Sequence, residues 1–233
     1  MIYIDTDIRP FDLQQALALC SQQRRSQALQ KKREEDRRLC VMTYRLLCRA
    51  LQAEYSIDGT PQLDYAAEGK PQLKDYPQIH FNWSHCRCGA VCGVSSAAIG
   101  VDAEAIRPYK DSLARYTLNE TEYRRVAESH SPDKAFVRLW TQKEALLKMT
   151  GKGLRTDLKT VLTQEREQVE AALNEKTVLT SFEISDGRAI PLDHEAEYLL
   201  PQVKIVSRHT QEQPLIVSVC LPASVFPYPP HAL

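Results

Sequence analysis

The sequence predicts a mixed α/β (α+β) fold, because one long helical pattern and several strand patterns share its 233 residues. Residues 136–154, FVRLWTQKEALLKMTGKGL, repeat apolar side chains at helical spacing. Residues 79–86, IHFNWSHC, and 99–106, IGVDAEAI, alternate apolar and polar side chains as half-buried strands do. Three further strand patterns lie in the C-terminal part, around Phe182, Ile205 and Val217.

Length and charge limit the possible classes of protein. The chain is long enough for one or two compact domains with a sizeable core. Its 30 basic and 30 acidic residues balance, so there is no overall field to favour nucleic acid or a membrane surface. No apolar run has membrane-spanning length, and the N-terminal MIYIDTDIRPFDL lacks the layout of a secretory signal. We therefore expect a cytoplasmic protein without nucleic-acid or membrane partners.

Seven cysteines, an odd number, are expected to be reduced thiols in that compartment. Cys86, Cys88 and Cys92 beside His85 suggest a zinc site as a less favoured alternative. No second pair of such ligands follows nearby, and the alternation from Ala90 to Val94 indicates a strand instead.

The N-terminal region combines a short strand at residues 2–4, a helical pattern at 11–20 and a polar run at 22–38. The polar run carries seven basic side chains and is expected to continue as one helix into the apolar residues 39–51. The run is either an ordinary solvated face or a phosphate-binding patch, and the two interpretations are about equally favoured. In the second, the bases that meet a charged ligand are Arg24, Arg25, Lys31 and Lys32.

Residues 54–78 contain several prolines and glycines and few apolar anchors, which predicts a long connection with little regular structure. Within it Lys70 precedes Pro71, which keeps the lysine backbone extended. Residues 111–128 are expected to form two short helices separated near Asn119.

The helix at residues 136–154 has clear start and stop signals. Ser131 is placed to cap it, Pro132 suits its first turn, and Gly151 and Gly153 end the pattern. Residues 226–233 are proline-rich and are expected to form a terminal tail.

Trp140, Glu144 and Lys148 lie four residues apart and so share one face of that helix. A surface pair between Glu144 and Lys148 is the ordinary explanation of such spacing. Asp102 and Glu104, two carboxylates on one face of an upstream strand, favour a functional interpretation instead. Ser84 and His85, where the other strand pattern ends, are able to donate to a phosphate, and no nearby acid favours a hydrolase triad.

These motifs, taken in order, resemble the 4′-phosphopantetheinyl transferase superfamily, most closely its pseudo-dimeric, surfactin-synthetase-activating type. The matching segments are FNWSH, GVDAE, FVRLWTQKEALLK and GKGL. The resemblance implies that Asp102, Glu104 and Glu144 bind Mg²⁺, and that Glu144 and Lys148 are catalytic. Either Glu144 or a water on the metal is then the base.

The same resemblance implies a set of coenzyme A ligands: Lys70, Ser84, His85, Arg24 and Lys148. Glu122 stands where some members have a further acid near the metal. The chain departs from the family in having Cys86 after the Ser-His pair and Ala103 between the two strand acids, and neither change removes a ligand.

The implied activity is that of a holo-[acyl-carrier-protein] synthase. It moves the 4′-phosphopantetheine arm of coenzyme A to a serine of an acyl or peptidyl carrier protein, with Mg²⁺, and releases adenosine 3′,5′-bisphosphate. Two alternatives remain open: a non-catalytic coenzyme A-binding module and a Mg²⁺-dependent hydrolase of nucleotide pyrophosphates. Implied too is a monomer of two similar α/β halves, residues 1–103 and 104–233, each with a small antiparallel sheet on a long helix.

Overall fold

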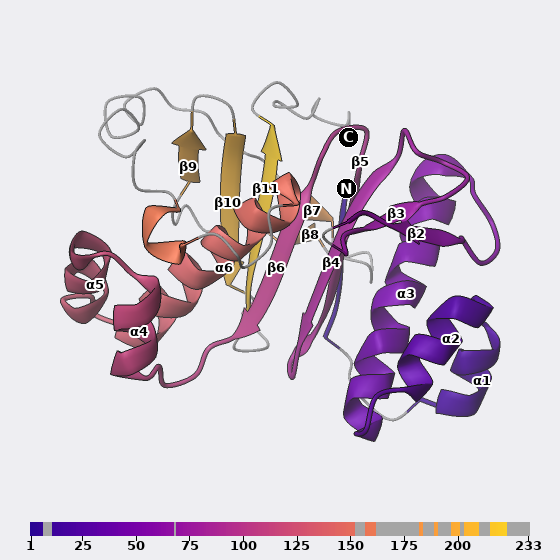
Figure 1. The fold of residues 1–233 in the computed structure, drawn as a ribbon, viewed down its shortest axis with the longest axis horizontal. Helices are drawn as coiled ribbons and strands as arrows, with labels where there is room; N and C mark the ends of the chain where they lie inside the picture. The colour runs from indigo at the N-terminus through magenta and orange to yellow at the C-terminus, as the bar shows by residue number, and fades with distance from the viewer. Residues whose placement is uncertain are drawn as a thin grey trace.

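The computed structural model describes residues 1–6, 11–67, 69–151, 157–161, 182–183, 189–190, 197–200, 203–209 and 215–222. The predicted end of the helical pattern at Gly153 and Leu154 and the predicted tail at residues 226–233 lie outside the described residues. The described residues form helices and small antiparallel sheets, so the α/β (α+β) class is confirmed (Figure 1).

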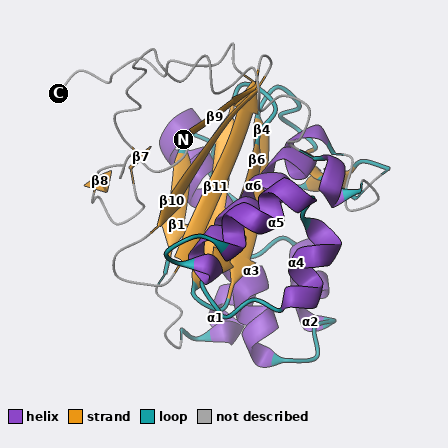
Figure 2. Ribbon diagram, turned by 90° about the vertical axis from the view of Figure 1, so that its left-hand side faces the viewer, coloured by secondary structure: helices purple, strands orange, loops and turns teal. Residues whose placement is uncertain are grey.

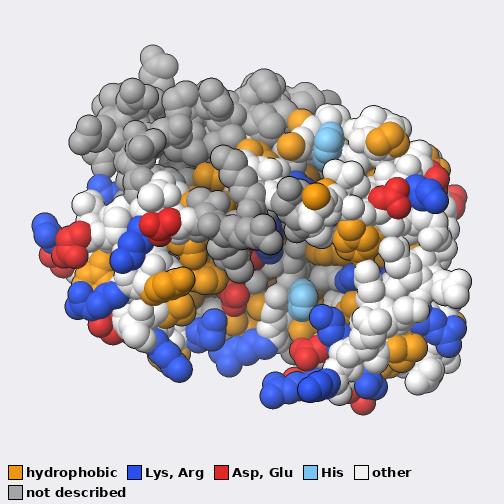
Figure 3. All heavy atoms as spheres, in the orientation of Figure 1, with side chains coloured by type: hydrophobic (Ala, Val, Ile, Leu, Met, Phe, Trp, Pro, Cys, Tyr) orange, Lys and Arg blue, Asp and Glu red, His pale blue; other side chains and the backbone are white. Residues whose placement is uncertain are grey.

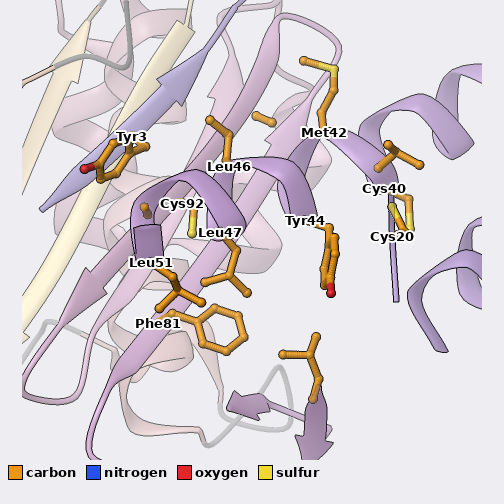
Figure 4. Packing of buried hydrophobic residues seen from close by; sticks show 14 of the residues in the cluster. Tyr3, Cys20, Cys40, Met42, Tyr44, Leu46, Leu47, Leu51, Phe81 and Cys92 are labelled. Atoms are coloured by element: carbon orange, nitrogen blue, oxygen red, sulfur yellow. The ribbon is translucent and has the colours of Figure 1, made fainter. Parts of the chain in front are cut away.

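The N-terminal layer is a three-stranded antiparallel sheet in the order β1-β5-β4. Its strands are β1 (Ile2–Asp5), β4 (His80–Cys86) and β5 (Gly89–Ser95). The helix α3 (Glu34–Tyr55) packs on this sheet, and α1 (Leu13–Ala18) and α2 (Gln22–Leu29) pack on α3. Figure 4 shows Leu47 and Leu51 of α3 lying against Phe81 of β4 and Cys92 of β5.

The C-terminal layer is a four-stranded antiparallel sheet in the order β6-β11-β10-β9. Its strands are β6 (Gly100–Ala105), β9 (Glu197–Leu200), β10 (Val203–His209) and β11 (Leu215–Pro222). The long helix α6 (Pro132–Thr150) crosses β6 and β11, as Figure 1 shows. In Figure 2, α4 (Asp111–Thr117) and α5 (Glu120–Ala127) lie with α6 on one side of the strands.

The remaining described elements are short. A turn of 3₁₀ helix lies at Leu158–Thr160, and two small hairpins are formed by β2 (Leu63–Tyr65) with β3 (Pro71–Leu73) and by β7 (Phe182–Glu183) with β8 (Ala189–Ile190).

The two layers meet where the edge strands β4 and β6 lie side by side. The backbone N–H of Val101 donates to Asn82 Oδ1 at 2.8 Å, so a buried side chain links the two strands. On the other face, one apolar core is continuous across both sheets, with side chains from β1, β5, β6 and β11. Continuous packing of this kind holds the edges of the two sheets in fixed positions.

Gly100 allows α6 to approach β6 closely. A Cβ placed at Gly100 would overlap the carbonyl oxygen of Ala145 and the backbone nitrogen of Met149. At Gly151 the chain leaves the helix with φ +74°, in the left-handed region where glycine is favoured. These two glycines fix where α6 lies and where it ends.

The basic run at the N-terminus does not form one helix, and that prediction was wrong. The chain breaks between Leu29 and Glu34, and α2 and α3 pack against each other. Ser21 caps α2 by accepting from the backbone N–H of Arg24, while Glu34, Glu35 and Asp36 fill the first turn of α3. Acidic residues at a helix N-terminus favour a new start there.

Three other expectations need smaller changes. The connection at residues 54–78 contains the β2–β3 hairpin as well as irregular chain. The strand β4 is buried at Asn82 and Ser84 as well as at Phe81, because those polar side chains face β6. Ser131 occupies the cap position of α6 without a side-chain hydrogen bond to the helix.

No helix in the described part of the chain is long and apolar enough to cross a membrane. The division of the chain into halves at residue 103 stays a prediction.

Candidate active site

Three side chains from three separate elements meet at the junction of the two sheets. Lys148 Nζ of α6 donates to Asp102 Oδ1 of β6 at 2.7 Å and to Ser84 Oγ of β4 at 3.0 Å. Ser84 Oγ in turn donates to Asp102 Oδ1 at 2.8 Å. Ser84 and Asp102 are 18 positions apart in the chain, and Asp102 and Lys148 are 46 positions apart. Their three side chains nevertheless meet at one place in the fold.

The alternation of β6 places its acids on the side of α6. Val101, Ala103 and Ala105 enter the apolar core shared by the two sheets. Asp102 and Glu104 therefore point to the opposite face, the face on which Gly100 meets α6. On α6, Glu144 and Lys148 are one turn apart and both are half-buried, so they face the same strand.

The three carboxylates influence one another electrostatically. Burial, followed by the charge of Asp102, raises the pKa of Glu104 above its usual value. Burial, and then the charge of Asp102, likewise raises the pKa of Glu144, and the Lys148 ammonium opposes both shifts. The three acids thus interact electrostatically with one another and with the Lys148 ammonium.

Two carboxylate oxygens in this cluster are buried and accept no hydrogen bond: Asp102 Oδ2 and Glu144 Oε1. A buried anionic oxygen without a partner is costly, and a bound cation would satisfy it. Carboxylate oxygens are also the ligands that hard divalent cations prefer. The chemistry of Asp102, Glu104 and Glu144 therefore fits Mg²⁺.

The geometry of the cluster is nonetheless not that of a closed metal site. Among the residues that the structure describes, no group of three or more His, Cys, Asp or Glu side chains is arranged so that it could hold a metal ion. The arrangement is centred on Lys148, whose ammonium is bound to Asp102.

His85 lies exposed next to the buried Ser84, within the influence of several positive charges. Partial burial of the ring and the charges of Lys148, Arg24 and Lys31 lower the pKa of His85. In Figure 3, basic, acidic and histidine side chains line a hollow between the α6 side and the α3 side of the molecule. Positive charge beside a hollow favours an anionic ligand.

Arg24, predicted as a coenzyme A ligand, has a structural role here. Its guanidinium donates to the carbonyl oxygen of Cys40 through Nε at 3.0 Å and Nη2 at 2.8 Å, and to Thr43 Oγ1 at 2.7 Å. It also lies 4.4 Å from the centre of the Trp83 ring. Arg24 thus ties α2 to α3 and brings positive charge near β4.

Lys70 lies at the C-terminal end of α6. Its ammonium donates to the carbonyl oxygens of Met149 at 2.9 Å and Ile99 at 3.3 Å, and burial lowers its pKa. These contacts satisfy a carbonyl in the last turn of the helix, where cations are favoured. Lys70 therefore does not join the contact between Ser84, Asp102 and Lys148.

Lys143, next to Glu144, is a residue whose role the sequence reasoning missed. Its ammonium is buried and donates to Glu122 Oε2 at 2.7 Å and to the Leu158 carbonyl at 2.6 Å. Its position supplied a signal, because Lys143 lies four residues from both Leu139 and Leu147 on the apolar stripe. Glu122, which the resemblance associated with the metal, is held in this ion pair.

The cysteines near His85 do not converge. Cys92 lies in the core under α3, whereas Cys86 and Cys88 lie in the core on the opposite face of the sheet. Burial raises the pKa of the Cys86 thiol to about 12, which keeps it protonated. The described geometry gives the zinc alternative no support.

Comparison with known proteins agrees with the order of the motifs. The sequence profile of the 4′-phosphopantetheinyl transferase superfamily matches residues 98–199, a range that includes β6 and α6. A 4′-phosphopantetheinyl transferase of Bacillus subtilis is 29% identical over 162 residues, covering 67% of this chain and 71% of its own. The enzyme Sfp of the same species is 26% identical with the same coverage. HetI of Nostoc, also a 4′-phosphopantetheinyl transferase, is 39% identical over 41% of this chain and 44% of its own.

The matched region and the site coincide, since Asp102, Glu104, Glu144 and Lys148 all fall within residues 98–199. The chain is therefore similar to the 4′-phosphopantetheinyl transferase superfamily in the region that holds β6 and α6, and similar to two transferases of Bacillus subtilis over about two thirds of its length.

Proposed function

We propose that this enzyme transfers the 4′-phosphopantetheine arm of coenzyme A to a serine hydroxyl of an acyl or peptidyl carrier protein. The reaction requires Mg²⁺ and releases adenosine 3′,5′-bisphosphate. The observation that carries the proposal is the contact of Lys148 with Asp102 and Ser84, which joins the three motifs in one place. The names of the similar proteins support the same reaction class.

In the proposed reaction, the serine oxygen of the carrier forms a bond to the β-phosphorus of coenzyme A. The bond from that phosphorus to the bridging oxygen breaks, and the bridging oxygen leaves with adenosine 3′,5′-bisphosphate. The serine proton passes to Glu144. Glu144 is suited to this role by its position, because it lies one turn from Lys148 on the side of α6 that faces β6.

Asp102, Glu104 and Glu144 are proposed to hold the Mg²⁺ ion, since two of them present buried oxygens that accept no hydrogen bond. When bound, Mg²⁺ supplies positive charge that neutralises the pyrophosphate oxygens and stabilises the leaving group. Lys148 adds a further positive charge on the same side.

The proposed coenzyme A ligands are Ser84, His85, Lys148, Arg24 and Lys70. His85 is exposed beside Ser84, and the positive charges of Lys148 and Arg24 reach it. Arg24 and Lys70 are proposed to act mainly through their charge, because both already donate to backbone carbonyls. In that role they attract the phosphates while their side chains keep their hydrogen bonds to backbone carbonyls.

The proposed protein partner is a carrier domain, and the enzyme is proposed to act as a monomer in the cytoplasm. A non-catalytic coenzyme A-binding module would leave the nucleotide intact. A pyrophosphate hydrolase would release adenosine 3′,5′-bisphosphate without any carrier protein. The nucleotide product therefore separates the three functions.

The test is to incubate the protein with coenzyme A and Mg²⁺, with and without an apo carrier protein, and to quantify adenosine 3′,5′-bisphosphate chromatographically. We expect release only when the carrier is present, in equal amount to the modified carrier. A carrier whose serine is replaced by alanine is the matched control and should give none. Release without carrier would overturn the proposal in favour of the hydrolase.

A further inference from the structure

The Lys148 ammonium forms an ion pair with Asp102, one of the three proposed metal ligands. It lies 2.7 Å from Asp102 Oδ1, and its charge opposes the rise in pKa that burial causes at Glu104 and Glu144, so its charge reaches all three carboxylates. The side chain of Asp102 is only 7% exposed, whereas that of Lys148 is 29% exposed. The aspartate is therefore fixed inside the protein, and the lysine reaches it from a wetter position.

Asp102 and Lys148 also differ in how they are held in place. Asp102 lies on a strand paired with β11 and accepts from Ser84 in addition to Lys148. Lys148 is in the last turn of α6, and its ammonium is carried at the end of a long side chain with four rotatable bonds. If one partner moves when a cation enters, it is the lysine ammonium.

We propose that Lys148 is a built-in counterion, which occupies Asp102 while the metal is absent and is displaced from it when a divalent cation binds. This inference rests on the proposed metal site. It explains why the described carboxylates do not form a closed metal site, although two of their oxygens are buried without partners. It also gives Lys148 a second function, in the protein without substrate, beyond its proposed role toward the pyrophosphate.

Competition of this kind predicts a weaker binding of metal to the free protein than three carboxylates alone would give. A positive charge within a few ångströms of a divalent ion opposes the binding of that ion by electrostatic repulsion. The repulsion between Lys148 and the metal ion is removed when the ammonium moves away from Asp102 or binds an anionic co-substrate. Coenzyme A phosphates, which would take the ammonium of Lys148, should therefore increase the affinity for metal.

The experiment measures Mn²⁺ binding to the free protein, without coenzyme A, by electron paramagnetic resonance of the unbound ion. Mn²⁺ prefers the same oxygen ligands as Mg²⁺. We compare wild type with Lys148→Met, which keeps the length of the side chain and removes its charge, and with Lys148→Arg, which keeps the charge. Lys134→Met is the matched control, because Lys134 is on the same helix and about 21 Å away along its axis.

We expect Lys148→Met to lower the Kd for Mn²⁺ about tenfold or more, and Lys148→Arg and Lys134→Met to leave it within about twofold. Circular dichroism of each variant establishes that it is folded before binding is compared. An unchanged Kd in folded Lys148→Met would overturn the counterion role while leaving the metal site intact. Absence of Mn²⁺ binding in both wild type and Lys148→Met would overturn the metal site, and this inference with it.

A second measurement, thermal unfolding in the presence of a chelator, tests the same idea without metal. Asp102 is buried and loses its ammonium partner in Lys148→Met, so the melting temperature of this variant should fall when chelator is present. Saturating Mn²⁺ should raise the melting temperature of Lys148→Met by more than it raises that of wild type. Equal increases in the two proteins would contradict the proposal.

Discussion

Lys143 Nζ and Glu122 Oε2 lie 2.7 Å apart, and both side chains are almost completely buried between α5 and α6. The pair fixes the residue that directly precedes Glu144, the proposed base. Glu122 also accepts from the backbone N–H of Asn119 in the capping box of α5. The site thus depends on an ion pair that takes no part in the proposed chemistry.

Removing one partner of this pair should strongly destabilise the protein. Lys143→Met leaves the Glu122 carboxylate buried without its cation, and we expect a loss of about 3–5 kcal/mol in the free energy of unfolding. Urea denaturation measures it. The double variant Lys143→Met with Glu122→Gln should recover part of the loss, because the amide oxygen still caps α5 and no unpaired charge remains.

The exposed pair of Arg115 with Asp111 is the control for that prediction. Its N–O distance of 2.8 Å is similar, but its side chains are about 60% exposed. Arg115→Ala should leave the unfolding transition nearly unchanged. Equal losses in Lys143→Met and Arg115→Ala would show that burial is not what makes the first pair important.

Gly100→Ala should displace α6 from β6. The added methyl group overlaps the carbonyl oxygen of Ala145, and backbone atoms cannot move aside as a flexible side chain does. We expect a loss of about 1–3 kcal/mol in unfolding free energy and a fall in transfer rate beyond the fraction unfolded. Gly59→Ala, at a glycine with φ +94° and open space around it, should cost only about 1 kcal/mol and leave the transfer rate unchanged.

Asn82→Ala should weaken the junction between the two sheets. The N–H of Val101 then has no acceptor in a buried position, which costs about 1–3 kcal/mol. The effect should appear in hydrogen exchange as faster exchange of the Val101 amide than in wild type. Unchanged protection of that amide would mean that another group replaces the Asn82 oxygen.

The acids of the site should make the protein less stable at neutral pH than it would be without them. Burial raises the pKa of Glu144 above its ordinary value of 4.5, so the folded protein keeps this proton to a higher pH than the unfolded chain does. In that window the folded state binds more protons, and stability falls as pH rises. Glu144→Gln should therefore be more stable than wild type at neutral pH.

The gain in Glu144→Gln should shrink below pH 4.5, where the carboxyl is protonated in both the folded and the unfolded state. Denaturation series at neutral and acidic pH without metal test the sign. If Glu144→Gln gained the same stability at both pH values, burial of the Glu144 charge would not be the cause of the gain.

The sequence predicted most of the local structure that carries the site. The alternation of Asp102 and Glu104 and the helical spacing of Glu144 and Lys148 are local properties, and both gave the correct element and face. The contact between Lys148, Asp102 and Ser84 is a matter of tertiary packing, and no spacing in the chain reveals it. The resemblance to a family supplied the expectation that these residues meet.

Other features depend on competing contacts that the sequence does not display. The packing of α2 against α3 includes Arg24, whose guanidinium donates to the Cys40 carbonyl and lies over the Trp83 ring. Lys70 looked like a projecting cation, but the end of α6 at Gly151 offers it carbonyl oxygens. In both cases a long basic side chain satisfies backbone acceptors, which a count of charges cannot predict.

The junction residues are proposed to transfer phosphopantetheine with the help of a metal ion. The most direct test is the intact mass of an apo acyl carrier protein after incubation with the enzyme, coenzyme A and Mg²⁺, beside a chelator control and Asp102→Ala. We predict a gain of one phosphopantetheine arm with wild type and Mg²⁺, and no gain in either control. A full gain with Asp102→Ala, or in the presence of chelator, would contradict the metal assignment. No gain on several acyl and peptidyl carriers, despite binding of coenzyme A, would contradict the transfer itself.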